Sequence, residues 1–400
     1  MKRMLIVFLS LVIAGSMLLT ACTPVASTTQ APAENQPTAA VEQPTEAQPA
    51  VAVPTVAPAV AQPAVAVPTV APAVAPLVKG DFVVPLGWIL NDEFVAEVAA
   101  QELGYYADSG LPKVTFVAGG GSTGLDPIKS INGLAAQVKI GIAATIFFVI
   151  QAHAAGLDVV VVGSQLQYDP TAYITLLKSG EERTIGPCDF KGRIVAQQTD
   201  SQWLAKALGE FCPKDQGGPL VASTDFTIIP AGFDVSPLTS KQADYLTGFA
   251  VNQPYMLVQQ GLVQGKDWDL FLASDFIPLY YADPIVTTHA YIMDHPEVVD
   301  AFVKATIKGL QYNLDYPDKS VEIASNIEGV DPGHAKWRIP AQNKLVVSPG
   351  ATGTETHGLG WTDPTLIQTM IQFLYDNGQI DHVFDANEII DNTFLPGPGK

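Results

Sequence analysis

Arginine, cysteine and histidine are scarce in this chain of 400 residues, and each scarcity argues against a class of function. Lys and Arg together number 21 against 40 Asp and Glu, so the formal net charge is -19 at pH 7. A field of this sign repels nucleic acid and anionic lipid headgroups, so we expect no nucleic-acid partner. Cys-x-x-Cys and His-Glu-x-x-His patterns are absent and the six histidines are scattered. We therefore expect neither a metal site nor a cofactor.

The three cysteines fall into two groups. Cys22 closes an N-terminal apolar segment, whereas Cys188 and Cys212 form an even pair in the body of the chain. An even pair outside the cytoplasm is a disulfide candidate, with two buried thiols as the alternative. Sequence alone does not show whether their Cα atoms come within the ~7 Å that a disulfide requires.

The first 22 residues have the form of a bacterial lipoprotein signal. Lys2 and Arg3 precede an apolar core over 4–19, and Leu-Thr-Ala-Cys at 19–22 matches a lipobox. This core is shorter than the roughly 20 residues of a membrane span. We expect residues 1–21 to be a cleaved signal peptide and Cys22 to be acylated, palmitate included, with a plain signal anchor as the alternative. The mature chain would then be lipid-anchored on the extracytoplasmic face of the cell membrane.

Residues 22–77 have the composition of a tether. They are almost entirely Ala, Val, Pro, Gln and Thr, and the sequence QPAVAVPTVAPAVA at 48–61 recurs unchanged at 62–75. No aromatic side chain is present to build a core, and regular prolines favour polyproline II. We expect a disordered linker that spaces the folded part from the membrane.

The remainder, from Val78, alternates strand and helix patterns. It is long enough for two lobes. Expected strands lie at 82–86, 113–117, 138–143, 158–162, 193–196 and 285–291. Expected helices lie at 91–103, 201–211, 296–315 and 364–377. Two more are expected, one that begins near 126 and one that follows the strand 138–143 and ends at 155. This rhythm predicts an α/β fold with a mostly parallel sheet covered by helices on both faces.

Several motifs in this part resemble one known family. They are WILN at 88–91, SQLQY at 164–168 after the run 152–163, DFKGR at 189–193, PAGFDVSP at 230–237, QADYLTGFAVNQP at 242–254, and HPEVV at 295–299. Each motif is weak alone, but their order and spacing together are specific. The chain resembles the substrate-binding proteins of ABC importers, in the branch of the thiamine-pyrimidine and sulfonate binders.

This resemblance implies a two-lobed type II periplasmic binding protein fold, with a ligand cleft between lobes joined by two crossings. Lobe 1 would comprise 78–180 with 285–400, and lobe 2 would comprise 181–284. The crossings would lie near 177–180 and 281–284. The implied function is capture of a small molecule, closure of the lobes as a hinge, and delivery to a transmembrane permease.

The expected ligand is a flat, uncharged heteroaromatic molecule. A small anion would need paired cations or several backbone donors in a dry cleft, and this chain is poor in arginine. Within the family the chain is most similar to riboflavin binders, so riboflavin is the first choice. A thiamine pyrimidine precursor or a sulfonate-type molecule is the alternative. The glycine-rich loop at 119–124 is either an anion cradle or a tight turn.

Eleven residues are candidates for the ligand site because they lie at or near expected strand ends and connecting loops. Aromatic stacking is assigned to Trp88, Tyr168, Tyr173, Trp203 and Tyr255. Hydrogen bonds to the ligand's edge are assigned to Asn91, Gln165, Gln167, Thr199, Asp200 and Asn252. Each has a structural alternative as a core, turn or capping residue. Asp225 and Asp283 are weaker candidates.

We expect no enzymatic activity. Enzymes of this fold that make the thiamine pyrimidine carry a cysteine cluster, and this chain has none. A synthase-like enzyme is therefore the different-class alternative, and no ordered Ser-His-Asp set supports another one. A sensor or adhesion module on a stalk would share the same tether.

Overall fold

A computed structural model of the chain describes residues 75–119, 126–133, 135, 137–178, 185–350 and 353–399. The expected signal peptide, the lipid site at Cys22, nearly all of the linker and most of the 119–124 loop lie outside these residues. Among the described residues, no helix is long and apolar enough to cross a membrane.

The described elements alternate as the sequence predicts. The strands are β1 (Phe82–Pro85), β2 (Val114–Val117), β3 (Gly141–Ile142), β4 (Val160–Tyr168), β5 (Thr171–Leu176), β6 (Ile194–Gln197), β7 (Thr227–Pro230), β8 (Tyr245–Phe249), β9 (Trp268–Leu272) and β10 (Tyr280–Thr287). The helices are α1 (Val95–Glu102), α2 (Tyr105–Asp108), α3 (Pro127–Ile131), α4 (Ile146–Ala154), α5 (Gln202–Glu210), α6 (Ser236–Thr239), α7 (Pro254–Gln259), α8 (His289–Asp294), α9 (Pro296–Asp315), α10 (Pro317–Ser325), α11 (Pro332–Gln342), α12 (Thr354–His357) and α13 (Pro364–Asp376).

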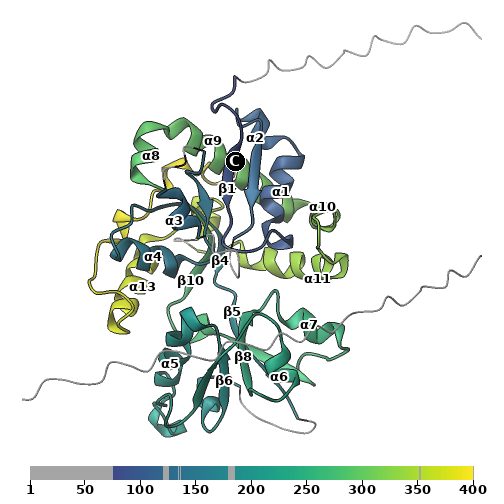
Figure 1. Cartoon of the computed structure of the whole chain (residues 1–400), viewed down its shortest axis with the longest axis vertical. Coiled ribbons are helices and arrows are strands. Elements are labelled where there is room, and N and C mark those ends of the chain that lie inside the picture. The colour runs from purple at the N-terminus through teal and green to yellow at the C-terminus, as the bar shows by residue number, and fades with distance from the viewer. Residues whose placement is uncertain are drawn as a thin grey trace, which may run out of the picture. The chain divides into compact units, whose positions relative to one another are not determined.

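These strands form three sheets among the described residues. The orders are β1-β2, β3-β10-β4 and β7-β6-β8-β5-β9. In Figure 1, β5, β6, β8 and helices α5 to α7 lie in the lower part, while the other labelled elements lie above them. The expected α/β periplasmic binding protein class is confirmed by the solved structures described below.

The expectation of a mostly parallel sheet is wrong. β10 runs antiparallel to both β3 and β4, and β5 runs antiparallel to both β8 and β9. Among the named strands of the described residues, parallel pairing joins β1 with β2 and β6 with β7 and β8, and a few isolated bridges elsewhere are also parallel. A continuous apolar run reveals that a strand is buried on both faces, but it carries no information on the direction of its neighbour.

Strands β4, β5 and β10 lead between the two larger sheets. β4 belongs to the three-stranded sheet, and after Asp169 and Pro170 the chain enters the five-stranded sheet as β5. β10 returns from β9 to pair with β4. The chain thus passes from the three-stranded to the five-stranded sheet between β4 and β5, before residue 180. The lobe boundaries at 180/181 and 284/285 remain a prediction, because pairing alone does not define rigid bodies.

Helix α9 has the bounds that its amphipathic pattern predicts, and it packs on α1. Gly309 makes this approach possible, since a Cβ at that position would lie 2.1 Å from the carbonyl oxygen of Ala96. The expected strand at 285–291 is only partly correct. β10 ends at Thr287 and α8 begins at His289, where the Thr288 side chain caps the helix by accepting from the Tyr291 N–H.

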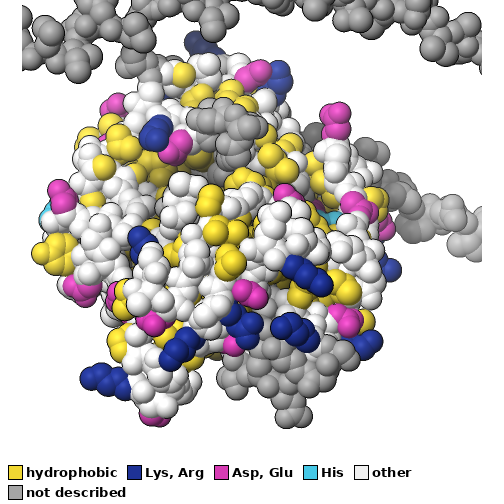
Figure 2. Space-filling view, turned by 60° about the horizontal axis from the view of Figure 1, so that its bottom comes forward, with side chains coloured by type: hydrophobic (Ala, Val, Ile, Leu, Met, Phe, Trp, Pro, Cys, Tyr) yellow, Lys and Arg dark blue, Asp and Glu magenta, His cyan; other side chains and the backbone are white. Residues whose placement is uncertain are grey.

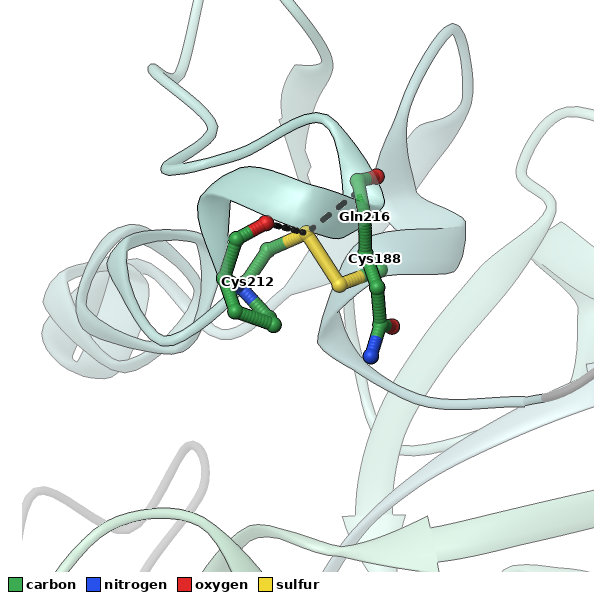
Figure 3. Close-up of a disulfide and its surroundings, with 4 residues drawn as sticks. Cys188, Cys212 and Gln216 are labelled. Atoms are coloured by element: carbon green, nitrogen blue, oxygen red, sulfur yellow. Dashed lines mark hydrogen bonds between the residues drawn. A yellow bond between two sulfur atoms is a disulfide. The ribbon is translucent and has the colours of Figure 1, made fainter.

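Cys188 and Cys212 form a disulfide, shown in Figure 3. Cys188 lies in a short 3-10 helix before β6, and Cys212 follows α5. Their Cα atoms are 4.8 Å apart. The carbonyl oxygens of Pro213 and Gln216 lie 3.8 and 3.9 Å from the Cys212 sulfur. The bond therefore ties the end of α5 to the start of β6.

Charged side chains of both signs are interspersed on the face of the molecule shown in Figure 2. Apolar side chains lie between them on the same face. The acidic surplus of the sequence is thus not gathered into one block on this face.

Replacing both cysteines, Cys188→Ala with Cys212→Ala, is expected to lower the free energy of unfolding by about 3 kcal/mol. The bond closes a loop with a sequence separation of 24, and closure of such a loop restricts the unfolded chain by about that amount. Urea unfolding of the wild-type chain with and without reductant provides the matched comparison. Equal unfolding midpoints for the oxidised and cysteine-free chains would contradict the prediction.

Candidate functional site

A cavity of about 190 Å³ lies between the five-stranded sheet and the part of the fold that holds the two- and three-stranded sheets. Its described lining comes from the turns after β1 and before α4, and from the elements around β6, β7 and β8. The residues are Gly87, Trp88, Glu93, Ala144, Thr145, Phe147, Phe148, Thr171, Gln198, Ser201, Leu204, Phe233, Thr247, Gly248, Phe249, Asn252 and Gln253.

Aromatic rings from both sheets meet at this cavity. Trp88 follows β1 and Phe233 follows β7, and their ring centroids are 4.2 Å apart at an interplanar angle of 71°. Phe233 is 41% exposed, so its ring also faces solvent. Such rings bind a flat aromatic solute by stacking or edge contact.

Two glycines let the backbone line the cavity closely. A Cβ on Gly87 would lie 2.4 Å from the amide nitrogen of Ala144, and one on Gly248 would lie 2.7 Å from Gln253 Oε1. Gln253 Oε1 accepts a hydrogen bond from the Phe249 N–H at 2.6 Å. Any side chain at either glycine would force apart the segments that form the wall.

Several polar groups at the cavity lack a partner among the described residues. The Oε1 atom of Glu93 and the Oγ1 atom of Thr145 are buried without a hydrogen bond. The side-chain amides of Gln198 and Asn252 also make none within the described part of the chain. Buried polar atoms are nearly always paired in proteins. These atoms are therefore positioned to bind a solute or water.

Glu93 is held in place from three sides. Its backbone N–H donates to Asn91 Oδ1 at 2.8 Å, which begins the 3-10 helix Asp92–Phe94. Arg338 Nη2 donates to Glu93 Oε2 at 2.9 Å, and Gln342 Nε2 donates to the Glu93 carbonyl at 2.9 Å. Helix α11 thereby fixes the carboxylate at the wall of the cavity.

Further carboxyl groups lie behind Glu93. Burial raises the pKa of Glu97 to about 7, although Gln165 Nε2 donates to its Oε1 at 2.6 Å. Burial, and next the negative charge of Glu93, hold the pKa of Asp283 well above its ordinary value. Both groups therefore retain a proton more readily than a solvent-exposed acid does.

The wall formed by the five-stranded sheet is supported by a hydrogen-bonded network. The Tyr173 hydroxyl donates to Gln197 Oε1 at 2.7 Å, and Thr247 Oγ1 donates to the same oxygen. Gln197 Nε2 donates to Ser201 Oγ at 3.0 Å. Thr247 and Ser201 line the cavity, so the network sets the positions of their hydroxyls.

The structure brings two of the eleven sequence-derived candidates to this cavity, Trp88 and Asn252. Asn91 lies next to the site as the cap that orients Glu93. Thr199 is exposed between β6 and α5, and the side chain of Asp200 lies outside the described residues. Their neighbours Gln198 and Ser201 are the residues that reach the cavity.

The other aromatic candidates lie in packing positions. Tyr173 is fully buried and stacks on Phe271. Trp203 packs its edge against Phe147, and Tyr168 is 39% exposed at the end of β4.

The remaining candidates have protein partners. Tyr255 donates its hydroxyl to Asp331 at 3.2 Å. Gln165 binds Glu97, and Gln167 donates to the Trp361 carbonyl at 2.9 Å. Asp225 accepts the Val221 N–H within its own loop. Contact of these side chains with a ligand remains a prediction.

Sequence reasoning missed Glu93, Thr145 and Phe233. Phe233 lies in the motif at 230–237, directly after a strand, and Glu93 lies two residues after Asn91. Position in a motif was the available signal for Phe233, and nearness to the motif at 88–91 was the signal for Glu93. Thr145 offered none, because it precedes an apolar helix that resembles any core segment.

Residues 91–320, more than half of the chain, match the model of the NMT1/THI5-like family. The chain therefore belongs to this family. It is 26% identical over 179 residues to riboflavin-binding protein RibY of Chloroflexus aurantiacus, covering 44% of this chain and 50% of that protein. It is also 26% identical over 244 residues to a formylaminopyrimidine-binding protein of Halalkalibacterium halodurans, covering 60% of this chain and 68% of that protein. The match to the first relative thus spans half of that relative's length.

Solved structures have the same fold at low sequence identity. The alkanesulfonate-binding protein SsuA of Xanthomonas axonopodis, bound to MOPS, matches with a TM-score of 0.55 and 13% identity, over 80% of this chain and 99% of that one. The desulfurization enzyme DSZB matches with a TM-score of 0.52 and 13% identity, over 78% of this chain and 97% of that one. The fold thus occurs in binding proteins and in an enzyme.

Glu97→Gln is expected to remove a pH-dependent destabilisation of about 3 kcal/mol. The folded-state pKa of Glu97 is raised from 4.5 to about 7, so the folded chain holds more protons than the unfolded chain between these values. Stability contributed by this group therefore falls as pH rises from 4.5 to about 7 and levels off above. Urea unfolding of wild type and variant from pH 5 to pH 8 measures the difference.

The exposed Glu102→Gln change on the same helix is the matched control for that series. Its curve should run parallel to the wild-type curve. Parallel curves for Glu97→Gln as well would show that burial of Glu97 does not shift its titration.

Trp88→Ala is expected to weaken solute binding by roughly 1–3 kcal/mol if the indole ring lies against the solute, the range seen for aromatic stacking on bases. Trp268→Phe, in β9 and not among the lining residues, is the control. Calorimetric titration of the folded variants with the solutes named in the next section checks this. An unchanged affinity of a folded Trp88→Ala variant would remove Trp88 from the site.

Proposed function

We propose that this chain is the solute-binding component of an ABC importer and that it captures a small nitrogen heterocycle in the cavity between its sheets. The observation that carries the proposal is the contacting pair Trp88 and Phe233 at the cavity wall, beside polar side chains without hydrogen-bond partners among the described residues. A flat ring that fills this space would contact both aromatic walls and complete those hydrogen bonds. The closed form would then dock on a membrane permease.

The size of the cavity favours a single-ring solute. At about 190 Å³ it is smaller than the roughly 300–1,000 Å³ typical of pockets for drug-sized ligands. An aminopyrimidine, the class named for the Halalkalibacterium relative, fits these dimensions and presents donors and acceptors along its edge. We therefore place a thiamine pyrimidine precursor ahead of riboflavin on geometric grounds.

Riboflavin is the second candidate. The similarity to RibY supports it, and the aromatic walls suit a fused ring system as well. Its larger ring system and ribityl chain would require the two sheets to move apart from their present positions. We propose a binding protein, and we propose neither a synthase-like nor a desulfurization activity.

We also propose that Cys22 carries the lipid that holds the protein on the outer face of the cytoplasmic membrane. The lipobox at 19–22 and the proline-rich segment that follows it support this. Cys22→Ala is expected to release the protein from the membrane fraction. Fractionation with mass measurement of the mature N-terminus tests it, and membrane retention of an unacylated variant would contradict it.

Titration of the full chain with 4-amino-5-hydroxymethyl-2-methylpyrimidine and with riboflavin tests the proposed function. We expect near-equimolar binding of the pyrimidine by calorimetry and weaker binding of riboflavin, followed by flavin fluorescence quenching. Tighter binding of riboflavin would reverse their order. Absence of binding for either molecule and for a panel of other nitrogen heterocycles would refute the function.

A further inference from the structure

We propose that Glu93 is the specificity-determining residue of the cavity: its carboxylate accepts a hydrogen bond from an N–H group of the solute and excludes anionic solutes. This inference rests on the proposed solute-binding function and names the class of solute that the site admits. That class is a neutral or cationic nitrogen heterocycle with a donor on its edge. Sulfonates and other small anions are the class that the site rejects.

The first support is the position of the carboxylate. Glu93 lines the cavity although only 5% of the residue is exposed. Its Oε2 atom is occupied by Arg338, itself fully buried, at 2.9 Å. Its Oε1 atom has no hydrogen-bond donor in the described part of the chain, and the Asp283 side chain lies against this carboxylate. A carboxylate oxygen that is desolvated in this way binds a donor strongly, because no water competes for it.

The second support is the charge around the cavity. Among its described lining residues Glu93 is the one with an ionisable carboxylate, and none is Lys or Arg. Arg338 is not among the lining residues; its Nη2 donates to Glu93 and its Nε to Gln342 Oε1 at 2.7 Å, and its buried Nη1 has no partner among the described residues. An anion in the cavity would lie near the Glu93 carboxylate with no Lys or Arg among the described lining residues, and like charges brought together in this way cost several kcal/mol.

The third support is the set of groups behind Glu93. Asp283 lies against Glu93, and burial, and next the negative charge of Glu93, raise the pKa of Asp283 well above its ordinary value. Asp92 is engaged by the His334 ring at 2.7 Å, and Glu97 by Gln165. A carboxylate has lone pairs enough for Arg338, for a neighbouring acid and for a solute. None of these neighbours supplies a cation to the cavity itself.

The expected solute geometry follows from the same positions. A ring that lies against the contacting pair Trp88 and Phe233 would direct one edge to Glu93 and Thr145, on the upper side. Its other edge would face the amides of Gln198 and Asn252, which serve as donor or acceptor. An amino group fits the Glu93 edge and a ring nitrogen or hydroxyl fits the amide edge. This division explains how one site distinguishes the two edges of an aminopyrimidine.

Calorimetric titration of the full chain with three probes tests the inference. They are 4-amino-5-hydroxymethyl-2-methylpyrimidine, its analogue with methyl in place of the amino group, and ethanesulfonate. Wild type should bind the amino compound about 10- to 100-fold more tightly than the methyl analogue, the range for a hydrogen bond to a charged group. Ethanesulfonate should bind at least 100-fold more weakly than the amino compound.

The variant Glu93→Gln preserves the shape of the side chain and an acceptor for Arg338. It should lose most of the discrimination between amino and methyl compounds, while its affinity for the methyl analogue should change less than threefold. Glu102→Gln, on the exposed side of the neighbouring helix, should retain the wild-type ratio. If Glu93→Gln does not fold, the ratio of the two pyrimidines on the wild-type chain decides the question by itself.

The possible failures are distinguishable. Equal affinity for the amino and methyl compounds, or tighter binding of ethanesulfonate, would overturn the role of Glu93 while leaving solute binding intact. A folded Glu93→Gln variant with the wild-type ratio would do the same. Failure of every probe to bind would overturn the solute-binding function and this inference together.

Discussion

The buried ion pair between Glu93 and Arg338 is the constraint on which the site depends. Both side chains are almost completely excluded from water, and they lie 2.9 Å apart on elements far separated in the sequence. Removing one partner of such a pair leaves a buried charge and costs about 3–5 kcal/mol. The same pair holds helix α11 against the 3-10 helix that precedes α1 and fixes Glu93 at the wall of the cavity. Stability and recognition are therefore coupled in a single contact.

The arrangement of sheets determines what this carboxylate can do. Trp88 and Glu93 come from the turn after β1, whereas Phe233 and Asn252 come from loops at the ends of β7 and β8. A solute in the cavity would touch both groups at once. Its binding energy would favour the approach of the two sheets, since a ligand shifts an equilibrium only by contacts that differ between its states. β4, β5 and β10, which connect the sheets, are where such a motion would be accommodated.

The fold class followed from the alternation of strand and helix patterns and from the order of family motifs, and α9 was predicted at its exact bounds. The direction of strand pairing was not predicted correctly, because a burial pattern shows which faces of a strand are buried and not which strand lies beside it. Trp88 and Asn252 lie at the cavity, and their contact with a ligand stays a prediction. Tyr173 and Trp203 instead fill the core, since an aromatic side chain at a strand end or early helical turn has the same sequence signature in either role.

The sequence by itself determined the class of the protein, its acidic character and the pair of cysteines available for a disulfide, and it predicts an anchor and a tether. Those properties depend on composition, local periodicity and motif order, which are all written along the chain. The site was decided by the tertiary structure alone. Glu93 becomes a recognition group only because Arg338 and Gln342, some 245 to 249 positions away, occupy its other atoms and remove water from its surroundings. Desolvation and the positions of partners in space are properties of packing, and no local pattern encodes them.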